Sequence, residues 1–151
     1  MKITVLLRQD HETVKSLFNA YKKTTDRTQN GKKELFEEIR REIMIHSQME
    51  TEIFYSALDG TTSTRAEELV SSAVEEHTTI EKLLHELGNM NGHDRQFDTK
   101  MTSLIDHVNG HIEKEEEEIF DEARKNLPEF RLEELGLEME DRRKILSTLA
   151  A

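Results

Sequence analysis

Apolar residues recur at steps of three and four along most of the chain, which is the period of an amphipathic α-helix. Steps from Leu35 reach Ile39 and Ile43, and steps from Met101 reach Leu104. No stretch shows the strict alternation of apolar and polar residues, bounded by turn residues, that is typical of a β-strand. The pattern therefore predicts an all-α fold.

Glycines and polar clusters divide this pattern into segments. We expect helices over about 10–25, 32–58, 64–87 and 95–126, with cap candidates at 61–64, and a less regular helical segment over about 131–149. Polar residues 24–26 end the first helix, Asn30-Gly31 precedes the second, Pro128 follows the fourth, and Gly136 interrupts the last segment. Short connections force neighbouring helices to be antiparallel. We therefore predict one domain over 1–151: an antiparallel up-down-up-down four-helix bundle over about 8–126, with an additional C-terminal helical segment over about 129–150.

Histidines and glutamates interrupt the apolar stripes at matching places. Each bundle helix carries one histidine in its stripe, and two of these histidines begin a His-x-x-x-Glu motif: His11, His46 with Glu50, His77, and His111 with Glu115. Residues i and i+4 share a helix face, with Cβ atoms about 6 Å apart. Burying carboxylates without a partner costs several kcal/mol, which a cation between the helices would offset. The pattern predicts a site for two metal ions that the carboxylates bridge.

This ligand set arises from an internal repeat, and its second copy is imperfect. The segment around His11 resembles the segment around His77 at an offset of 66 residues. Aligned on the histidines of the two motifs, Glu50 corresponds to Glu115, whereas aligned on the Ile-Phe pairs that follow, it corresponds to Glu116. A regular helix presents Glu115, and a π-bulge would present Glu116. Both alternatives remain open, with one of the two as the ligand.

Coordination numbers leave room for one more protein ligand. Two octahedral ions offer about twelve positions, of which four histidines, two bridging carboxylates and a bridging oxygen fill about ten. The candidates are Glu81, one turn after His77, and His107, one turn before His111, with water as the remaining option. A single vacancy would then admit a small molecule such as dioxygen. His85 and His93 are expected to be exposed.

Composition restricts the partners and the ligand types. Acidic residues outnumber basic ones by 32 to 21, and the net charge of -11 argues against a nucleic-acid partner. The absence of cysteine excludes thiolate ligands, so any metal is held by nitrogen and oxygen. The apolar start over 3–7 is too short for a signal sequence or a membrane span, so we expect a cytoplasmic protein without membrane contact. The leucine-rich C-terminal segment could pack on the bundle or mediate a dimer, which predicts a monomer or a weak homodimer.

These motifs resemble those of the hemerythrin-like HHE cation-binding domain of bacterial hemerythrins. The resemblance rests on Asp10-His11, the two His-x-x-x-Glu motifs and Glu75-Glu76-His77, runs from about 6 to 123, and extends to the tail over 135–144. It implies a left-handed four-helix bundle and a non-haem centre of two iron ions bridged by an oxo or hydroxo group. The ligand roles it implies fall on these residues: His11, His46, Glu50, His77, His111 and one of Glu115 or Glu116.

The same resemblance bears on the last ligands. Oxygen-carrying members place their final carboxylate, an aspartate, five residues after its histidine, which favours Glu116. They also have a second histidine one turn after the third-helix ligand, where this chain has Glu81. A site richer in carboxylate suits iron or peroxide chemistry at least as well as reversible oxygen carriage.

Three functions fit these features. The first is a di-iron protein that binds or reacts with dioxygen, peroxide or a similar small ligand, for oxygen binding, oxygen or redox sensing, or peroxide removal. The second is an iron storage or iron-sensing module. The third is a zinc- or manganese-binding interaction domain. Whether the protein is an enzyme with oxygen or peroxide reactivity, or a binding protein, stays open at this stage.

Overall fold

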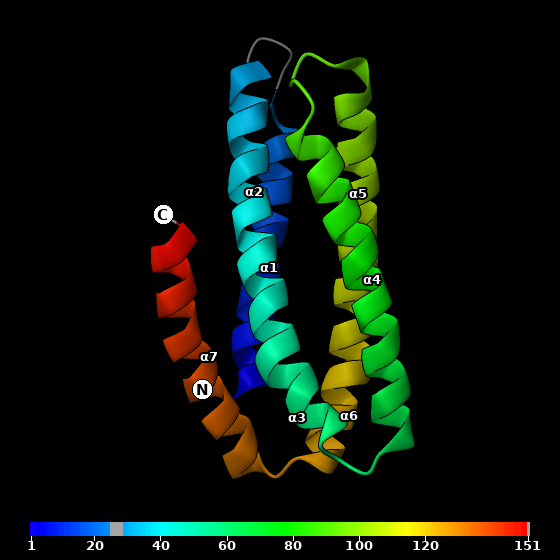
Figure 1. The fold of residues 1–151 in the computed structure, drawn as a ribbon, viewed down its shortest axis with the longest axis vertical. Helices are drawn as coiled ribbons and strands as arrows, with labels where there is room; N and C mark the ends of the chain where they lie inside the picture. The colour runs from blue at the N-terminus through cyan, green and yellow to red at the C-terminus, as the bar shows by residue number, and fades with distance from the viewer. Residues whose placement is uncertain (25–28, 151) are drawn as a thin grey trace.

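Long antiparallel helices form a bundle in the computed structural model, which describes residues 1–24 and 29–150. The four bundle helices alternate in direction along the long axis (Figure 1): α1 (Ile3–Lys22), α2 (Gln29–Met49), α4 (Thr64–Gly88) and α5 (Arg95–Lys114). Helix α1 packs against α2, and α4 packs against α5. The predicted all-α, up-down-up-down bundle is confirmed.

Two of the bundle helices continue through a π-helical turn. After α2 come η2 (Glu50–Tyr55) and α3 (Ser56–Asp59), and after α5 come η3 (Glu115–Ile119) and α6 (Phe120–Asn126). The junction residue Met49 keeps right-handed helical angles, with φ −61° and ψ −42°, so the chain does not break there. A π-turn places one extra residue in the helix without ending it. Each of the two predicted long helices is therefore one continuous rod.

Side-chain caps define where the later helices begin. The hydroxyl of Ser63, among the predicted cap candidates, accepts a hydrogen bond of 3.0 Å from the Ala66 amide. The Asp94 carboxylate accepts one of 2.8 Å from the Gln96 amide at the start of α5. Such caps satisfy amides that have no partner within the helix. At the other end of α4, the Lys33 ammonium donates to the carbonyls of residues 87, 88 and 90.

The turn between α1 and α2 differs from the prediction. Helix α1 ends at Lys22, earlier than the predicted residue 25, and residues 25 and 26 of the predicted polar run over 24–26 lie outside the described residues. Helix α2 begins at Gln29, so Asn30-Gly31 lies inside the helix rather than before it. Helix ends are the boundaries that a local sequence pattern defines least well.

The C-terminal segment is a regular helix, α7 (Glu129–Ala150), that packs against α1 and α2 (Figure 1). Its inner face buries Leu132, Leu135, Met139 and Leu146, as expected for a segment that packs on its own bundle. The predicted interruption at Gly136 is wrong, because the helix runs through this residue. A Cβ there would lie 1.9 Å from the Met1 carbonyl oxygen, so the glycine lets the N-terminal backbone cross α7.

The apolar core is divided into two clusters along the bundle axis. One contains Leu7 and Ala73 and includes the buried side of α7, and the other contains Val14 and Ile80. Along α1, His11 lies between Leu7 and Val14. Along α4, His77 lies between Ala73 and Ile80. A polar layer therefore crosses the bundle between its two apolar clusters.

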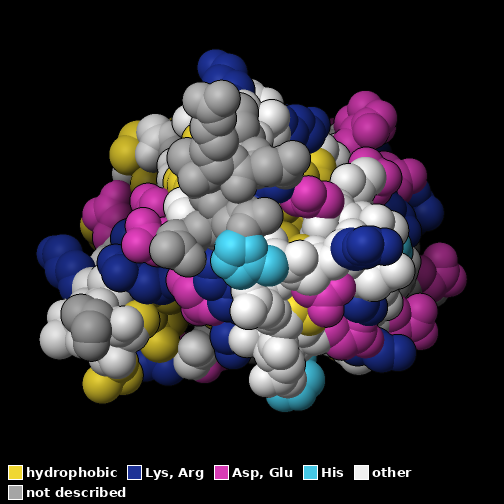
Figure 2. Space-filling view, turned by 90° about the horizontal axis from the view of Figure 1, so that it is seen from above, with side chains coloured by type: hydrophobic (Ala, Val, Ile, Leu, Met, Phe, Trp, Pro, Cys, Tyr) yellow, Lys and Arg dark blue, Asp and Glu magenta, His cyan; other side chains and the backbone are white. Residues whose placement is uncertain are grey.

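The outer surface carries interspersed charges of both signs. Figure 2 shows acidic and basic side chains mixed over the end of the bundle that carries the α4–α5 connection. Among the described residues, no helix combines the length and the apolar character needed to cross a membrane.

Candidate metal centre

Four histidines and two glutamates, one or two from each bundle helix, meet in the polar layer. All six are buried, with exposed fractions between 0% and 8%: His11, His46, Glu50, His77, His111 and Glu115. The two carboxylates are fully buried, at 0% each. Ionised carboxylates in such a position need compensating positive charge close by. Their donor atoms form two groups, one of His11, His46, Glu50 and Glu115 and the other of Glu50, His77 and His111, so that Glu50 belongs to both.

The first half-site consists of His11, His46 and one oxygen from each glutamate. His46 Nε2 lies 2.9 Å from Glu50 Oε2, and His11 Nε2 lies 3.1 Å from Glu115 Oε1. Within the part of the chain that the structure describes, none of these four buried atoms has a partner in hydrogen-bonding geometry. Buried donor atoms about 3 Å apart that form no hydrogen bonds with one another have the arrangement of ligands around an ion.

The second half-site consists of His77, His111 and the other oxygen of Glu50, and the other oxygen of Glu115 lies beside His111. Glu50 Oε1 lies 2.9 Å from His77 Nε2 and 3.4 Å from His111 Nε2. Glu115 Oε2 lies 3.5 Å from His111 Nε2, and the two histidine Nε2 atoms are 3.2 Å apart. Glu50 thus turns one oxygen to each half-site, which is the arrangement of a bridging ligand, and Glu115 turns its second oxygen toward His111.

The π-turn of the fourth helix decides which glutamate enters the centre. Glu115 follows His111 by a regular helical step, and η3 begins only at Glu115. The amide of Phe120 then donates to the carbonyl of Glu115, five residues earlier, which absorbs the extra residue of the second repeat. The structure therefore brings Glu115 into the centre, and the bulge restores Ile119 and Phe120 to the core instead of presenting Glu116.

Glu116 lies outside the two groups and has a different neighbour. Its carboxylate accepts from His11 Nδ1 at 2.6 Å, on the side of the ring that faces away from the centre. Asp10 contacts His46 Nδ1 at 3.0 Å, and Glu76 contacts His111 Nδ1 at 3.1 Å. We call Asp10, Glu76 and Glu116 the outer carboxylates. An ionised carboxylate can only accept a hydrogen bond. Each outer carboxylate therefore requires the proton of its histidine to be on Nδ1, which leaves the Nε2 atom of that ring facing the centre.

Sequence reasoning did not assign Asp10 or Glu76 a role, although a signal was present. Each stands directly before a histidine of the site, as Asp10-His11 and Glu76-His77, at the same offset as the repeat itself. Neither contacts the histidine that follows it in sequence. Asp10 on α1 reaches His46 on α2, and Glu76 on α4 reaches His111 on α5. The acidic residue before each of these two histidines therefore connects the two helices of its hairpin.

The buried carboxylates change the proton affinity of the histidines. Burial alone would lower the pKa of His46, but the charge of Glu50 and the hydrogen bond to Asp10 outweigh it and raise the pKa to about 10. Burial also opposes the charging of His111, whose pKa the bonds to Glu115, Glu50 and Glu76 raise to about 12. A proton on one of these rings and a metal ion both offset the negative charge of Glu50 and Glu115. Protonation of the histidines and metal binding therefore compete.

Tyr55 is the residue of the centre that sequence reasoning missed. Its side chain is buried, and its hydroxyl lies 2.7 Å from Glu50 Oε1 and 2.5 Å from Glu115 Oε2. Burial, followed by the charges of Glu115 and Glu50, raises the pKa of Tyr55 well above its ordinary value of 10.0. Tyr55 stands five residues after Glu50, off the regular helical stripe. The π-turn η2 brings these two residues together, and the sequence offers no direct sign of it.

The remaining candidates lie away from the centre. Glu81 is exposed, because the core positions that follow His77 on α4 are Ile80 and Leu84. His107 is also exposed, and its Nδ1 donates to the Ser103 carbonyl of its own helix. The structure brings neither into the two groups of donor atoms. His85 and His93 are exposed, as expected.

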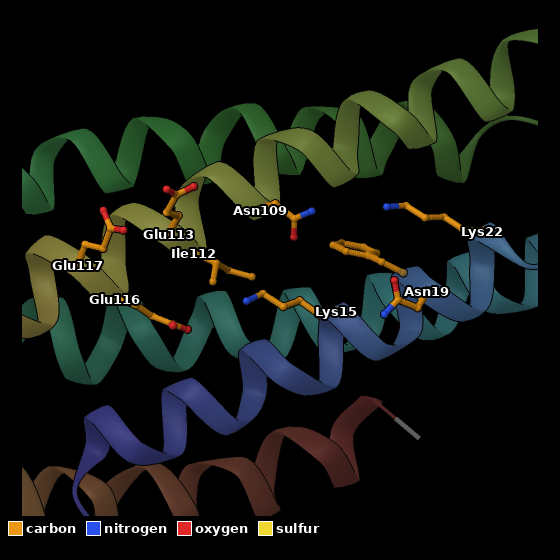
Figure 3. A pocket seen from close by; sticks show the side chains of 9 residues that line it. Lys15, Asn19, Lys22, Asn109, Ile112, Glu113, Glu116 and Glu117 are labelled. Atoms are coloured by element: carbon orange, nitrogen blue, oxygen red, sulfur yellow. The ribbon is translucent and has the colours of Figure 1, made fainter.

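Surface pockets approach each half-site at an outer carboxylate. One pocket of about 480 Å³ lies between α1 and α5, where Figure 3 shows Lys15 reaching from one side and Glu116 from the other. A second pocket of about 480 Å³, between α4 and α5, is lined by Glu76 and His111. On two faces of the bundle, a single outer carboxylate thus separates the donor atoms from a surface pocket.

A helical bundle with a buried layer of histidines and glutamates defines a metal-binding protein. The family model for the hemerythrin HHE cation binding domain matches residues 2–123, and the chain belongs to this family. A solved structure of a hemerythrin HHE cation binding domain-containing protein from Mycobacterium kansasii has the same fold, with a TM-score of 0.83. That likeness has 22% sequence identity and covers 97% of this chain and 87% of the other. Among curated proteins, none matches the chain.

Proposed function

We propose that the centre holds two iron ions and that the protein binds or reacts with dioxygen, peroxide or a similar small ligand. The observation that carries this proposal is the set of four buried donor atoms in the first half-site that have no hydrogen-bonding partner among the described residues. Polar atoms buried in this way are costly unless a missing partner supplies the interaction. Glu50 belongs to both groups of donor atoms, and Glu115 turns one oxygen to His11 and the other to His111, which calls for two cations.

The donor geometry fits ions of this size. Ligand bonds of about 2.1 Å at right angles place neighbouring donor atoms about 3.0 Å apart. The separations between neighbouring histidine and glutamate donors run from 2.9 to 3.5 Å. Imidazole together with carboxylate is a donor set that iron accepts readily, and bridged di-iron centres occur in other helical bundles.

The residues of the chain prepare the site in three ways. The histidines and glutamates converge on one layer, because long helices hold them rigidly. The outer carboxylates hold the imidazole rings with Nε2 turned inward. The apolar clusters above and below limit access to small molecules. A bound iron pair would supply Lewis acidity and one-electron redox chemistry at an exchangeable coordination position.

Anaerobic loading with ferrous iron, followed by air, tests this proposal. We expect iron uptake of two ions per chain and new absorption in the near-ultraviolet and visible when air is admitted. A double variant of the exposed histidines, His85→Ala with His93→Ala, is the matched control and should behave as the wild type. A protein that takes up iron but shows no spectral change on exposure to air or peroxide would contradict the reactive part of the proposal.

Metal analysis of protein purified without added metal tests the identity of the ions. The proposal predicts iron above zinc and manganese. Protein that contains zinc or manganese, and that does not exchange either for iron under anaerobic conditions, would favour a non-redox binding domain instead.

A further inference from the structure

We propose that Arg143, on the C-terminal helix α7, is a positioning residue for the first half-site. It fixes the Asp10 carboxylate in the orientation that holds the His46 ring toward a bound ion. The inference rests on the proposed two-metal function and deepens it, because it connects the docking of α7 to the loading of one half-site.

The first support is a continuous series of contacts from α7 to the centre. The Asp10 carboxylate, which is buried, is bound on one oxygen by the Arg143 guanidinium and accepts on the other from His46 Nδ1 at 3.0 Å. His46 Nε2 then lies 2.9 Å from Glu50 Oε2, inside the first half-site. A carboxylate held on both oxygens does not rotate freely, so the imidazole ring that it orients is fixed as well.

The second support is the position of Arg143 on α7. It follows Met139 by four residues and precedes Leu146 by three, and both of these residues are buried against the bundle. Arg143 thus lies on the inner, otherwise apolar face of the helix. A charge on such a face costs desolvation energy, which the ion pair with Asp10 offsets. An apolar residue at this position would pack α7 on the bundle but would leave Asp10 unbound on that oxygen.

The third support is that α7 approaches the elements of the first half-site. Helix α7 packs against α1, α2 and η2, which carry Asp10, His46 and Glu50. The outer carboxylate Glu76 belongs to α4 instead and lines a surface pocket beside His111. A change in the docking of α7 should therefore affect the first half-site and leave the second as an internal reference.

The connection must act in both directions. Coupling between two binding events is reciprocal, so a contact that strengthens iron binding is itself strengthened by iron to the same degree. Loading of the first half-site should therefore hold α7 more firmly on the bundle. This coupling gives the C-terminal helix a structural response to the metal content of the centre.

Two neighbouring arginines provide a matched pair of variants. Both lie on α7 with side chains exposed to similar extents, 36% for Arg142 and 34% for Arg143, and Arg142 pairs with Glu52 of η2. Loss of an outer partner weakens metal affinity about 10–100-fold, and Arg143 acts through such a partner, so we expect Arg143→Ala to weaken one step of an anaerobic ferrous titration about tenfold. Arg142→Ala should titrate as the wild type, and Arg143→Lys, which keeps the charge, should recover part of the affinity.

A double-mutant cycle tests whether Arg143 acts through Asp10. In an Asp10→Asn chain, Arg143→Ala should weaken iron binding no further, whereas two independent effects would multiply. Independent effects would overturn the positioning role. So would an Arg142→Ala chain that loses as much affinity as Arg143→Ala, because α7 would then support the whole bundle rather than one ligand.

Hydrogen exchange of the α7 amides supplies a readout other than affinity. Iron should slow this exchange in the wild type and in Arg142→Ala about tenfold more than in Arg143→Ala or Asp10→Asn, as reciprocity requires. Equal slowing in all four chains would overturn the inference. Circular dichroism of the metal-free variants serves as the folding control, and Arg143→Gln, which keeps most of the length of the side chain, replaces Arg143→Ala if that variant does not fold.

The outcomes separate this inference from the function on which it rests. A wild type that takes up no iron contradicts the proposed function itself. A wild type that takes up two ions, with an Arg143→Ala chain that gives the same titration, overturns the role of Arg143 alone.

Discussion

The two half-sites come from two copies of one helical hairpin, but their donor atoms are satisfied differently. In the first, the buried Nε2 and oxygen atoms have no aligned partner among the described residues. In the second, the Tyr55 hydroxyl lies against both shared carboxylates. A repeated sequence thus produces two unequal sets of buried donor atoms, because one of the two π-turns ends in a tyrosine.

The surroundings of the half-sites also differ. Asp10, the outer carboxylate of His46, is bound on its other oxygen by Arg143 from α7. Glu76, the outer carboxylate of His111, lines a surface pocket instead. The C-terminal helix therefore supports the first half-site through a charged contact.

Glu50→Gln should have the largest effect, because this residue serves both half-sites. The amide lacks the charge that two cations require, so we expect loss of both ions and destabilisation of the metal-free chain by about 3 kcal/mol or more. Iron content and urea unfolding measure the two effects. Glu52→Gln, on the exposed neighbouring carboxylate that pairs with Arg142, is the control and should retain both ions. Retention of both ions by Glu50→Gln would contradict a shared carboxylate.

Asp10→Asn and Glu76→Gln should weaken different half-sites. Each keeps the size of an outer carboxylate but removes its charge, and loss of such a partner typically weakens metal affinity about 10–100-fold. Stepwise titration with iron should show the weakened step at the first half-site for Asp10→Asn and at the second for Glu76→Gln. Identical titration curves for the two variants would contradict the separation into halves.

The stability of the metal-free chain should depend on pH through the site histidines. The pKa of His46 is raised to about 10 and that of His111 to about 12, from an ordinary value of 6.5. A raised pKa in the folded state means that protonation stabilises the fold fully below pH 6.5, and that this stabilisation is lost as pH rises through the folded pKa. We expect the free energy of unfolding to fall by roughly 1 kcal/mol per pH unit for each histidine above pH 6.5.

The iron-loaded chain should not show this fall, since the ions take the place of the protons. Urea unfolding at several pH values between 6.5 and 10, with and without iron, measures the difference. Equal slopes for the two forms would mean that the ions bind elsewhere.

Gly110→Ala should have the smallest effect. It tests the contribution of the helix backbone beside His111 independently of the ligand side chains. Gly110 stands next to His111, but a Cβ there would meet nothing within 4 Å. Alanine is favoured over glycine in a helix interior by about 1 kcal/mol, so thermal stability should rise modestly while iron content stays unchanged. Loss of iron would show that the backbone at this point must be free to adjust when the second half-site is loaded.

The sequence predicted much of this centre because helical phase is a local property. His11, His46, His77, His111 and Glu50 follow from the positions of polar residues within apolar stripes. Glu115 and Glu116 could not be separated, because the position of a π-turn depends on packing around Ile119 and Phe120. Tyr55 lay outside any regular stripe for the same reason.

Gly136 shows the same limit at the level of the fold. A glycine in a leucine-rich segment indicated an interruption, but its cause is a close approach by Met1, far away in the sequence. Contacts between distant segments decide such positions, and a local pattern does not contain them.

The central claim is that two ions share Glu50 and Glu115. Anomalous diffraction at the iron edge from crystals of the iron-loaded protein tests it most directly. The account predicts two iron peaks about 3.5–4 Å apart, one beside His11 and His46 and the other beside His77, His111 and Tyr55. A single peak within the bundle, or iron bound only at the surface, would contradict it.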